Sequence, residues 1–312
     1  MLTEKSKMDR RRFIAAGSAV LLAHQFHFGG WLKAQTGDLS SGPVVWEAEG
    51  ISYESVSALF AAFGGSGKLL PDGSSGATVV IKPNLCLPDP GERGTTTSST
   101  VVELFCRRLI ADGVKRIIVA DHTLKNTADF RSADLLALPK TYPEVKVLLA
   151  NEERMFEPVD IPGKVLQRVE RLKLLARADL FVNIATAKHH SATHVSLGVK
   201  NLMGAIWNRS DFHTKMDLAS AIGDLALAIR PSITVIDASR VLLSGGPTGP
   251  GPIVDSGRLF AGRDIVAVDA VVTSRYAFGG KSLRPSDVAH LRAAAENGVG
   301  EIDLQRITVK KV

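Results

Sequence analysis

The stretch Thr78-Val79-Val80-Ile81-Lys82-Pro83-Asn84 decides the fold class of this chain. Its first four residues favour a β-strand, and the polar residues that follow end the strand abruptly. Short runs of the same kind, rich in Val and Ile and apolar on both faces, recur at residues 116–119, 145–149, 180–184 and 233–236. Such runs are typical of the buried strands of a parallel sheet.

Helical patterns separate these runs. The candidate helices cover residues 56–63, 99–111, 217–229, 265–276 and 286–296. Ser99 is a candidate N-cap for the second of them, and Gly113 follows its end. The alternation predicts an α/β fold, with a mostly parallel sheet and helices on both faces in a single compact domain. Residues 150–175 are irregular and charged, which leaves room for a small subdomain insertion.

The first 34 residues form a different kind of segment. The run Arg10-Arg11-Arg12-Phe13 resembles a twin-arginine translocation motif, and an apolar stretch of about ten residues follows it. That stretch is too short to cross a hydrocarbon core of ~30 Å. We therefore expect a twin-arginine signal peptide at residues 1–34, a linker at 35–43 and the α/β domain at 44–312. The expected partner is the twin-arginine translocase and the expected location is the periplasm, with membrane anchoring if the signal is not cleaved.

The composition excludes several classes of protein. With 45% hydrophobic and 22% charged residues, the chain of 312 residues is not disordered. Its 2 cysteines exclude a disulfide scaffold and an iron–sulfur cluster built from this chain alone, and both are expected to be free thiols. The net charge is +6, but the signal segment supplies most of it. Aromatic residues make up 6% and are not interleaved with a basic patch, so nucleic acid is not an expected partner.

Polar side chains follow four of the predicted strands. In open α/β sheets, ligands bind beyond the carboxyl ends of the strands. The groups at these positions are, in chain order, Lys82 and Asn84, then Asp121 and His122, then Asn183 with Lys188, His189 and His190, and finally Asp237. Because these ends meet at one edge of the sheet, we expect the side chains to gather into one site.

The segment from 183 to 213 carries the most chemistry, because four of the 8 histidines of the chain lie in it. Neutral imidazole, together with Asp or Asn, suits a divalent metal. Lys188 and Lys200 instead suit an anion such as a carboxylate or a phosphate. Thr95 and Thr96 precede the helix at 99–111, where hydroxyls and free N–H groups favour an anion but serve equally well as helix caps. The histidine spacing matches no standard zinc motif.

These residues resemble the DUF362 family, a set of uncharacterised bacterial and archaeal proteins, some of which carry ferredoxin-type iron–sulfur modules. The shared pattern covers residues 81–84, Thr95-Thr96, 119–121, Asn183, Lys188, His190, 200–204, His213, Asp237, 246–249, 267–270 and 298–300. Two positions depart from the family, which usually has Lys in place of Thr186 and Thr in place of Ser196. The Cys-rich ferredoxin segment is absent, so the resemblance implies the fold unit but no electron-transfer role and no established reaction. A looser resemblance to the lactate racemases, whose nickel cofactor is handled by His and Lys residues, is an analogy only.

The leading hypothesis is an exported enzyme that acts on a small anionic molecule. His190 and His213 would be its general acid or base, and Lys188 would complete the catalytic set. The candidate substrate- or anion-binding residues are Lys82, Asn84, Thr95, Thr96, Asn183, Lys200 and Asn201.

Two alternatives remain open at this point. The first is a non-catalytic protein that binds a metal or a metal cofactor, and the second is a redox or maturation accessory protein. For a divalent metal, the candidate ligands are Asp121, His122, His189, His194 and Asp237. The sequence leaves the cofactor and the oligomeric state open.

Overall fold

A mixed sheet of nine strands organises the computed structural model, which describes residues 42–70, 74–89, 91–124 and 134–312. Within these residues, the strand order is β11-β1-β10-β9-β7-β2-β3-β4, and β8 pairs with β7. The strands are β1 (Val44–Glu49), β2 (Thr78–Lys82), β3 (Arg116–Asp121), β4 (Val145–Leu149), β7 (Leu180–His190), β8 (His194–Ser196), β9 (Ile233–Leu242), β10 (Ile253–Gly262) and β11 (Thr308–Lys311). The run from β9 through β7, β2 and β3 to β4 is parallel, whereas β10 is antiparallel to both β9 and β1.

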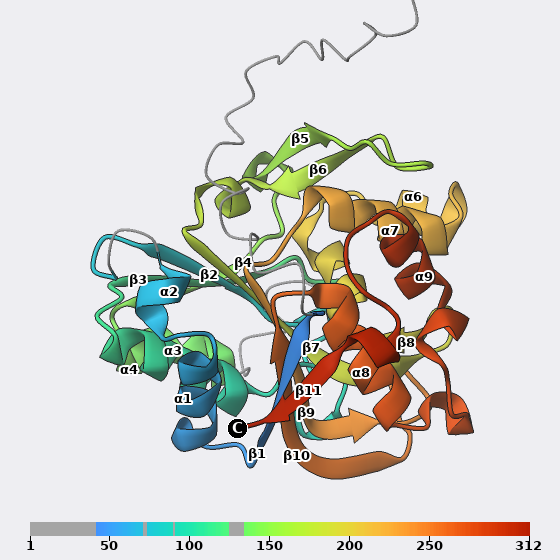
Figure 1. Ribbon diagram of the computed structural model, residues 1–312. Coiled ribbons are helices and arrows are strands. Elements are labelled where there is room, and N and C mark those ends of the chain that lie inside the picture. The colour runs from blue at the N-terminus through green and yellow to red at the C-terminus, as the bar shows by residue number, and fades with distance from the viewer. Residues whose placement is uncertain (1–41, 71–73, 90, 125–133) are drawn as a thin grey trace, which may run out of the picture. The chain divides into compact units, whose positions relative to one another are not determined.

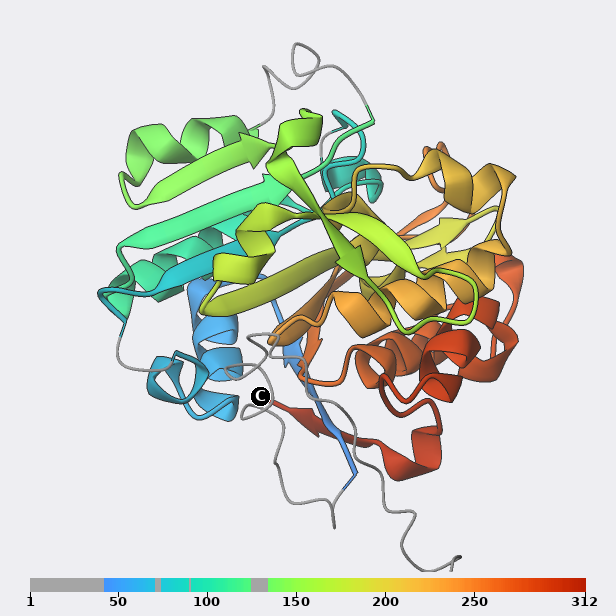
Figure 2. The same ribbon diagram turned by 90° about the horizontal axis from the view of Figure 1, so that it is seen from above.

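Helices cover both faces of this sheet (Figures 1 and 2). One face packs against α1 (Tyr53–Ala62), α3 (Ser99–Ala111) and α4 (Leu138–Thr141). The other packs against α7 (Leu218–Ala228), α8 (Ile265–Arg275) and α9 (Ala289–Glu296). The short helices are α2 (Ser66–Leu69), α5 (Gly198–Asn201) and α6 (Ser210–Thr214).

Strand β2 illustrates why its sequence is apolar throughout. Val79 and Ile81 belong to the core cluster under α1 and α3, while Val80 belongs to the cluster under α7, α8 and α9. Successive side chains of a strand point to opposite faces, so a strand buried on both sides is apolar along most of its length. The predicted α/β fold is therefore confirmed.

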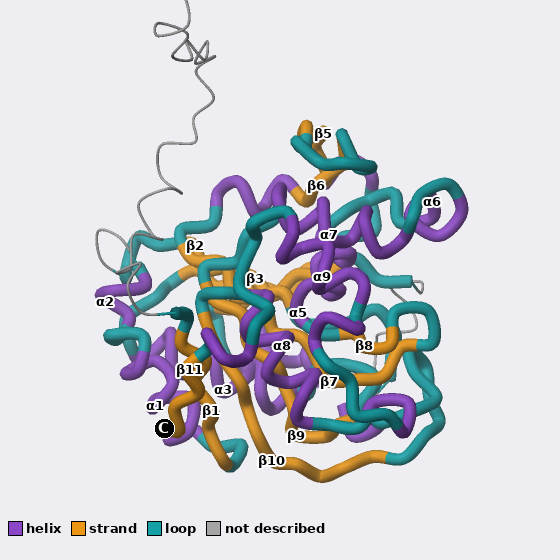
Figure 3. The backbone as a smooth tube through the Cα atoms, turned by 45° about the vertical axis from the view of Figure 1, so that its right-hand side comes forward, coloured by secondary structure: helices purple, strands orange, loops and turns teal. Residues whose placement is uncertain are grey.

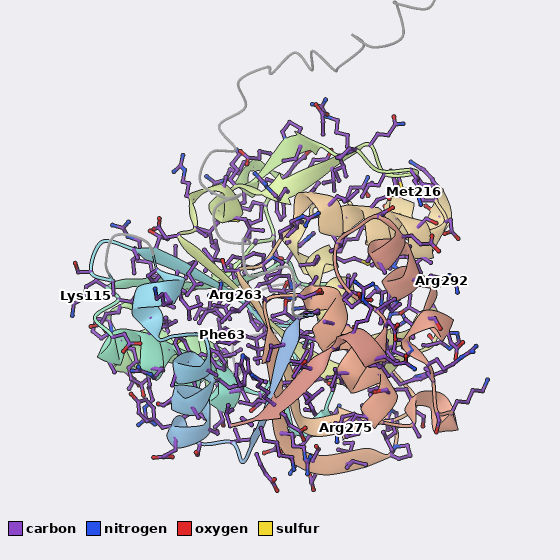
Figure 4. The ribbon with its side chains drawn as sticks, in the orientation of Figure 1. Phe63, Lys115, Met216, Arg263, Arg275 and Arg292 are labelled. Atoms are coloured by element: carbon purple, nitrogen blue, oxygen red, sulfur yellow. The ribbon has the colours of Figure 1, made fainter. Side chains whose placement is uncertain are left out.

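The edge of the sheet opposite β4 is stabilised by ion pairs and a cation–π contact as well as by apolar packing. The carboxylate of Glu47 on β1 is 3% exposed and pairs with Arg258 and Arg275, the latter at 3.0 Å. Arg263 lies 5.8 Å from the ring centre of Phe63, at the end of α1, and both are labelled in Figure 4. These contacts join the N-terminal strand to the last third of the chain.

Two expected strand ends are wrong. β7 continues to His190 and β9 to Leu242, so Asn183 and Asp237 lie inside their strands. Asn183 is paired with Lys82, the last residue of β2, and Asp237 is paired with Thr186. The polar residues still come together, because β2 and β3 stop at the level where β7 and β9 continue.

The irregular region at 150–175 contains a two-stranded antiparallel sheet, β5 (Phe156–Asp160) and β6 (Arg168–Leu172), which is separate from the central sheet in Figure 3. The expected signal peptide and most of the linker lie outside the described residues. Among the residues that are described, no helix is both long and apolar enough to cross a membrane.

Candidate functional site

A buried ion pair lies where β2 and β3 end. The Lys82 Nζ atom is 2.7 Å from Asp121 Oδ1, and both side chains are almost wholly buried. Lys82 also donates to the carbonyl of Pro83 at 3.0 Å and to Asn201 Oδ1 at 3.2 Å. Asp121 Oδ2 accepts from the backbone N–H of Leu85 at 2.6 Å. Burial lowers the pKa of Lys82, and the negative charge of Asp121 opposes this shift. The ammonium group of Lys82 is thus satisfied by hydrogen bonds and an ion pair within the protein.

Two asparagines extend this network across the sheet. Asn201 Nδ2 donates to Asn183 Oδ1 at 2.9 Å, and Asn183 Nδ2 donates to the carbonyl of Gly198 at 3.1 Å. Gly204 fits closely against the ion pair, because a Cβ atom at this position would collide with Asp121 Oδ1 and with Lys82 Nζ. The network fixes the segment 198–204 against the end of β2.

Helix α5 is held at its start by a buried carboxylate. The backbone N–H groups of Gly198 and Val199 both donate to Asp269, each at 2.8 Å. Burial raises the pKa of Asp269 to about 7, against the opposing effect of these two hydrogen bonds. A side chain at Gly198 would run into Thr234 and Asp269, so only glycine fits there. With both ends of α5 anchored, the position of Lys200 between them is set by the backbone.

The other two lysines of the site differ from Lys82 in their partners. Lys188 Nζ donates to the carbonyl of Thr95 at 2.5 Å and to that of Pro247 at 3.4 Å. Lys200 Nζ has a single hydrogen-bond partner among the described residues, the thioether sulfur of Met203 at 3.0 Å. Lys200 is 9% exposed. Burial, together with the charges of Lys188 and Arg209, lowers the pKa of Lys200 to about 8.

Arg209 is a member of the site that the sequence analysis missed. Its guanidinium donates to the carbonyls of His122 at 3.0 Å and Thr123 at 2.9 Å. Its positive charge lowers the pKa of Lys82, Lys200 and His213, in each case behind the effect of burial. No apolar run precedes it, so the strand-end criterion had no means of finding it. We call Lys82, Lys188, Lys200 and Arg209 the cationic cluster.

Cys86 lies near the cationic cluster, close enough to act electrostatically on the pKa of each of its four members. The thiol is free and partly exposed, and the second cysteine, Cys106, is free and buried. The expectation of two free thiols is confirmed.

Burial and the charges of the cationic cluster lower the pKa values of both predicted acid–base histidines, His190 and His213. Burial, followed by the charges of Lys200 and Lys188, lowers the pKa of His190 to about 3. The same two kinds of effect lower the pKa of His213, which lies on α6. Neighbouring ammonium groups disfavour a second positive charge on His190, and their effect adds to that of burial.

His290 on α9 is a further imidazole that the sequence analysis did not select. It is 1% exposed, and its Nε2 atom has no hydrogen-bond partner among the described residues. Burial and the charges of Lys200 and His190 lower its pKa to about 3. His290 lies in an apolar helical pattern that is typical of core residues, so the sequence does not indicate its position next to the cluster.

The five predicted metal ligands do not form one site. Asp121 is paired with Lys82, and Asp237 accepts from the N–H groups of Ser98 at 2.8 Å and Ser239 at 3.0 Å. His122 contacts the carbonyl of Ile206 at 2.7 Å, and its ring stacks on Trp207 with centroids 5.0 Å apart. His194 is the first residue of β8, with a φ of 63°, and is paired with His190, and His189 lies on β7. In the described parts of the chain, no three His, Cys, Asp or Glu side chains are grouped to hold a metal ion.

The predicted hydroxyl and amide anion ligands are likewise engaged. Thr95 and Thr96 donate to Asp89, at 3.1 Å to the carboxylate and 2.9 Å to the carbonyl, respectively. The side-chain Oδ1 of Asn84 accepts from the backbone N–H of Cys86 at 3.5 Å, and the backbone N–H of Asn84 donates to Thr97 Oγ1 at 2.8 Å. These residues shape the loop before α3, and the carbonyl of Thr95 in turn holds Lys188.

Two surface cavities adjoin the cluster. One has a volume of about 430 Å³, and Arg209 lines it together with His122, Trp207, Glu153 and Glu170. The other, of about 440 Å³, is lined by Thr95 and by the loop of Thr248, Gly249 and Pro250. Arg209 is therefore the member of the cluster that lines a cavity, and Thr95, whose carbonyl accepts from Lys188, lines the other one.

The fold and the site together define an α/β protein with a buried cationic site at the carboxyl edge of its parallel strands. The chain belongs to the family described as "Domain of unknown function (DUF362)", whose model matches residues 79–274. Among solved structures, the chain is similar to the lactate racemase apoprotein from Thermoanaerobacterium thermosaccharolyticum. The sequence identity is 14% and the TM-score is 0.38, and the match covers 80% of this chain and 56% of that one. Comparison with curated proteins finds no match.

Proposed function

We propose that this protein is an enzyme that acts on a small anionic molecule bound at the cationic cluster. The observation that carries the proposal is the environment of Lys200, a buried ammonium group whose only described partner is a thioether. An ammonium group buried without a counter-charge is costly, and an anion that enters the site removes this cost. Lys188 and Arg209 lie close enough for their charges to act on Lys200, and they complete a site for a carboxylate or a phosphate.

The three lysines have separate roles in this proposal. Lys82 is satisfied by Asp121 and holds the loop in place, so the anion is bound by Lys188, Lys200 and Arg209. His190 and His213 are neutral in the empty site and accept a proton from the bound molecule. A bound anion offsets the lysine charges, which brings the pKa of His190 back toward its ordinary value and makes it a better base.

Anion binding can be tested by calorimetric titration with inorganic phosphate and with acetate. We expect binding that is lost in Lys200→Met and retained in Lys115→Met, since Lys115 (labelled in Figure 4) is exposed and precedes the start of β3, at the opposite end of that strand from Asp121. Affinity should fall by up to tenfold per pH unit above the Lys200 pKa of about 8, because the empty site must then take up a proton to bind. Equal binding by the two variants at every pH would contradict the proposal.

A non-catalytic anion-binding protein is the second candidate. The low pKa of His190 favours it, because an imidazole of pKa about 3 is a weak base. The two candidates separate in one measurement: bound anion that is recovered chemically unchanged after long incubation supports the binding protein. Conversion that stops in His190→Gln, with binding retained, supports the enzyme.

Export by the twin-arginine translocase is also a proposal, and the run Arg10-Arg11-Arg12-Phe13 supports it. Fractionation of cells that produce the chain would test it. We expect the protein outside the cytoplasm, and we expect Arg11→Lys with Arg12→Lys to keep it inside. Equal distribution of the two forms would contradict export by this route.

A further inference from the structure

The lysines of the cationic cluster differ in whether their nitrogen atoms are free to react. Lys82 Nζ contacts three oxygen atoms, from Asp121, Pro83 and Asn201, at 2.7 to 3.2 Å. Lys188 Nζ contacts two carbonyl oxygens. Within the described residues, Lys200 Nζ makes no hydrogen bond and no ion pair to an oxygen atom. A thioether is a weak acceptor, so Lys200 is the member of the cluster that is least held in its ammonium form.

We propose that Lys200 is a nucleophile that forms an imine with the carbonyl carbon of a small 2-oxo carboxylate. The inference rests on the proposed function, in which the cluster binds anions. Lys188 and Arg209 supply two cationic groups for the carboxylate, and the anchoring of α5 by Asp269 and Asn201 fixes the backbone on both sides of the nucleophile. A carboxylate held beside Lys200 presents the adjacent carbonyl carbon to its nitrogen.

The reaction balances without an oxidant or a reductant. The lone pair of neutral Nζ attacks the carbonyl carbon, a C–N bond forms, and the carbonyl electrons pass to oxygen. One nitrogen proton moves to that oxygen to give a carbinolamine. The hydroxyl then leaves as water with a second proton from nitrogen, and a C=N bond remains. His190 and His213 lie close enough to Lys200 for its charge to lower their pKa values, so either imidazole can carry these protons.

The pKa of Lys200, which burial lowers to about 8, agrees with this role. Roughly one Lys200 in ten is neutral at pH 7, whereas an ordinary exposed lysine is neutral in roughly one chain in a few thousand. A lysine buried beside other cations is a recognised way to obtain a nucleophilic amine. Lys200 should therefore react well before the surface lysines do.

Reductive trapping tests the inference on the full chain. The protein is incubated at pH 7 with pyruvate and cyanoborohydride, and the modified peptide is located by mass spectrometry. We expect one reduced adduct per chain, on Lys200, formed before any adduct on exposed Lys115. Lys200→Arg keeps the positive charge, and we expect it to remain without the adduct. An adduct spread evenly over surface lysines would overturn the inference, and peptide mapping of the wild-type chain gives this result even if the variant fails to fold.

Acetate separates this inference from the proposed function, because it carries the anionic group but no reactive carbonyl. If acetate and pyruvate both bind by calorimetry and no adduct forms on Lys200, the nucleophile is wrong and the anion site stands. If neither binds, the anion site is wrong and the nucleophile falls with it.

Discussion

Replacing Lys200 by methionine should make the protein more stable. The pKa of the buried ammonium falls from 10.5 to about 8, and each pKa unit is equivalent to ~1.4 kcal/mol. Keeping Lys200 charged at neutral pH therefore costs the folded state about 3 kcal/mol. Methionine has a similar unbranched shape and no charge, and replacing buried charges by apolar side chains often stabilises proteins by about 1–4 kcal/mol. We expect Lys200→Met to raise the free energy of unfolding by about 3 kcal/mol at pH 7.

The pH dependence provides the control for this prediction. Below pH 8 the lysine is charged in both the folded and the unfolded state, so its cost is fully present. As the pH rises from 8 to 10.5, the folded state loses its proton first, and the cost disappears. Urea unfolding of both forms at pH 7 and near pH 10 measures the difference. A variant that is less stable than the wild type at pH 7, or a difference that does not shrink at high pH, would refute the reasoning.

Three further predictions concern groups around the cluster. Asp121→Asn leaves Lys82 buried without a counter-charge and should cost about 3–5 kcal/mol in urea unfolding; a loss below 1 kcal/mol would argue against a structural ion pair. Gly204→Ala places a methyl group against that pair and should lower the unfolding free energy by about 1–3 kcal/mol, so unchanged stability would contradict the tight fit. His290 has a pKa of about 3 in the folded state, against 6.5 ordinarily, so the unfolded state takes up its proton first as the pH falls. Stability should thus be lost between pH 6.5 and 3, by up to ~1.4 kcal/mol per pH unit for this residue, and His290→Asn should show a smaller loss between pH 7 and 5.

The parallel half of the sheet could be predicted from the sequence because its strands are rich in Val, Ile and Leu and its central strands are buried on both faces. Residues 78–81, 116–119 and 145–149 are mostly apolar, although they include Arg116 and Lys146, and each run lies within an observed strand. The other half of the sheet, formed by β10, β1 and β11, could not be found in this way. In β1, Val45 is buried while its neighbours Val44 and Trp46 are only half-buried, and in β11 all four residues are exposed. What fixes these strands is pairing between distant parts of the chain, which a local pattern does not contain.

The same limit of a local sequence pattern determines which residues of the site could be predicted. Residues next to a strand end, such as Lys82 and Asp121, could be predicted to meet because the sheet brings strand ends together. The ion pair between Lys82 and Asp121 could not be predicted, because it depends on the register of two strands. This ion pair removes Asp121 from the predicted metal site. Arg209 and His290 follow no strand. Arg209 lies in a loop and His290 lies on α9, and only the tertiary packing of the chain brings them near the cluster.

The charge balance of the cluster argues for a ligand more strongly than any single contact does. The chain does place carboxylates in its interior, but Asp237 and Asp269 are used to accept backbone N–H groups, and Asp121 is used by Lys82. Lys188, Lys200 and Arg209 are left with carbonyls and a sulfur atom. Stability alone would favour an apolar residue in place of Lys200, at a gain of about 3 kcal/mol. An anion that restores the ordinary pKa of Lys200 recovers the same free energy, which corresponds to about a hundredfold in affinity. The free energy that charged Lys200 costs the empty site is therefore the same free energy that a bound anion recovers. Lys200→Met should remove both the cost and the gain in affinity.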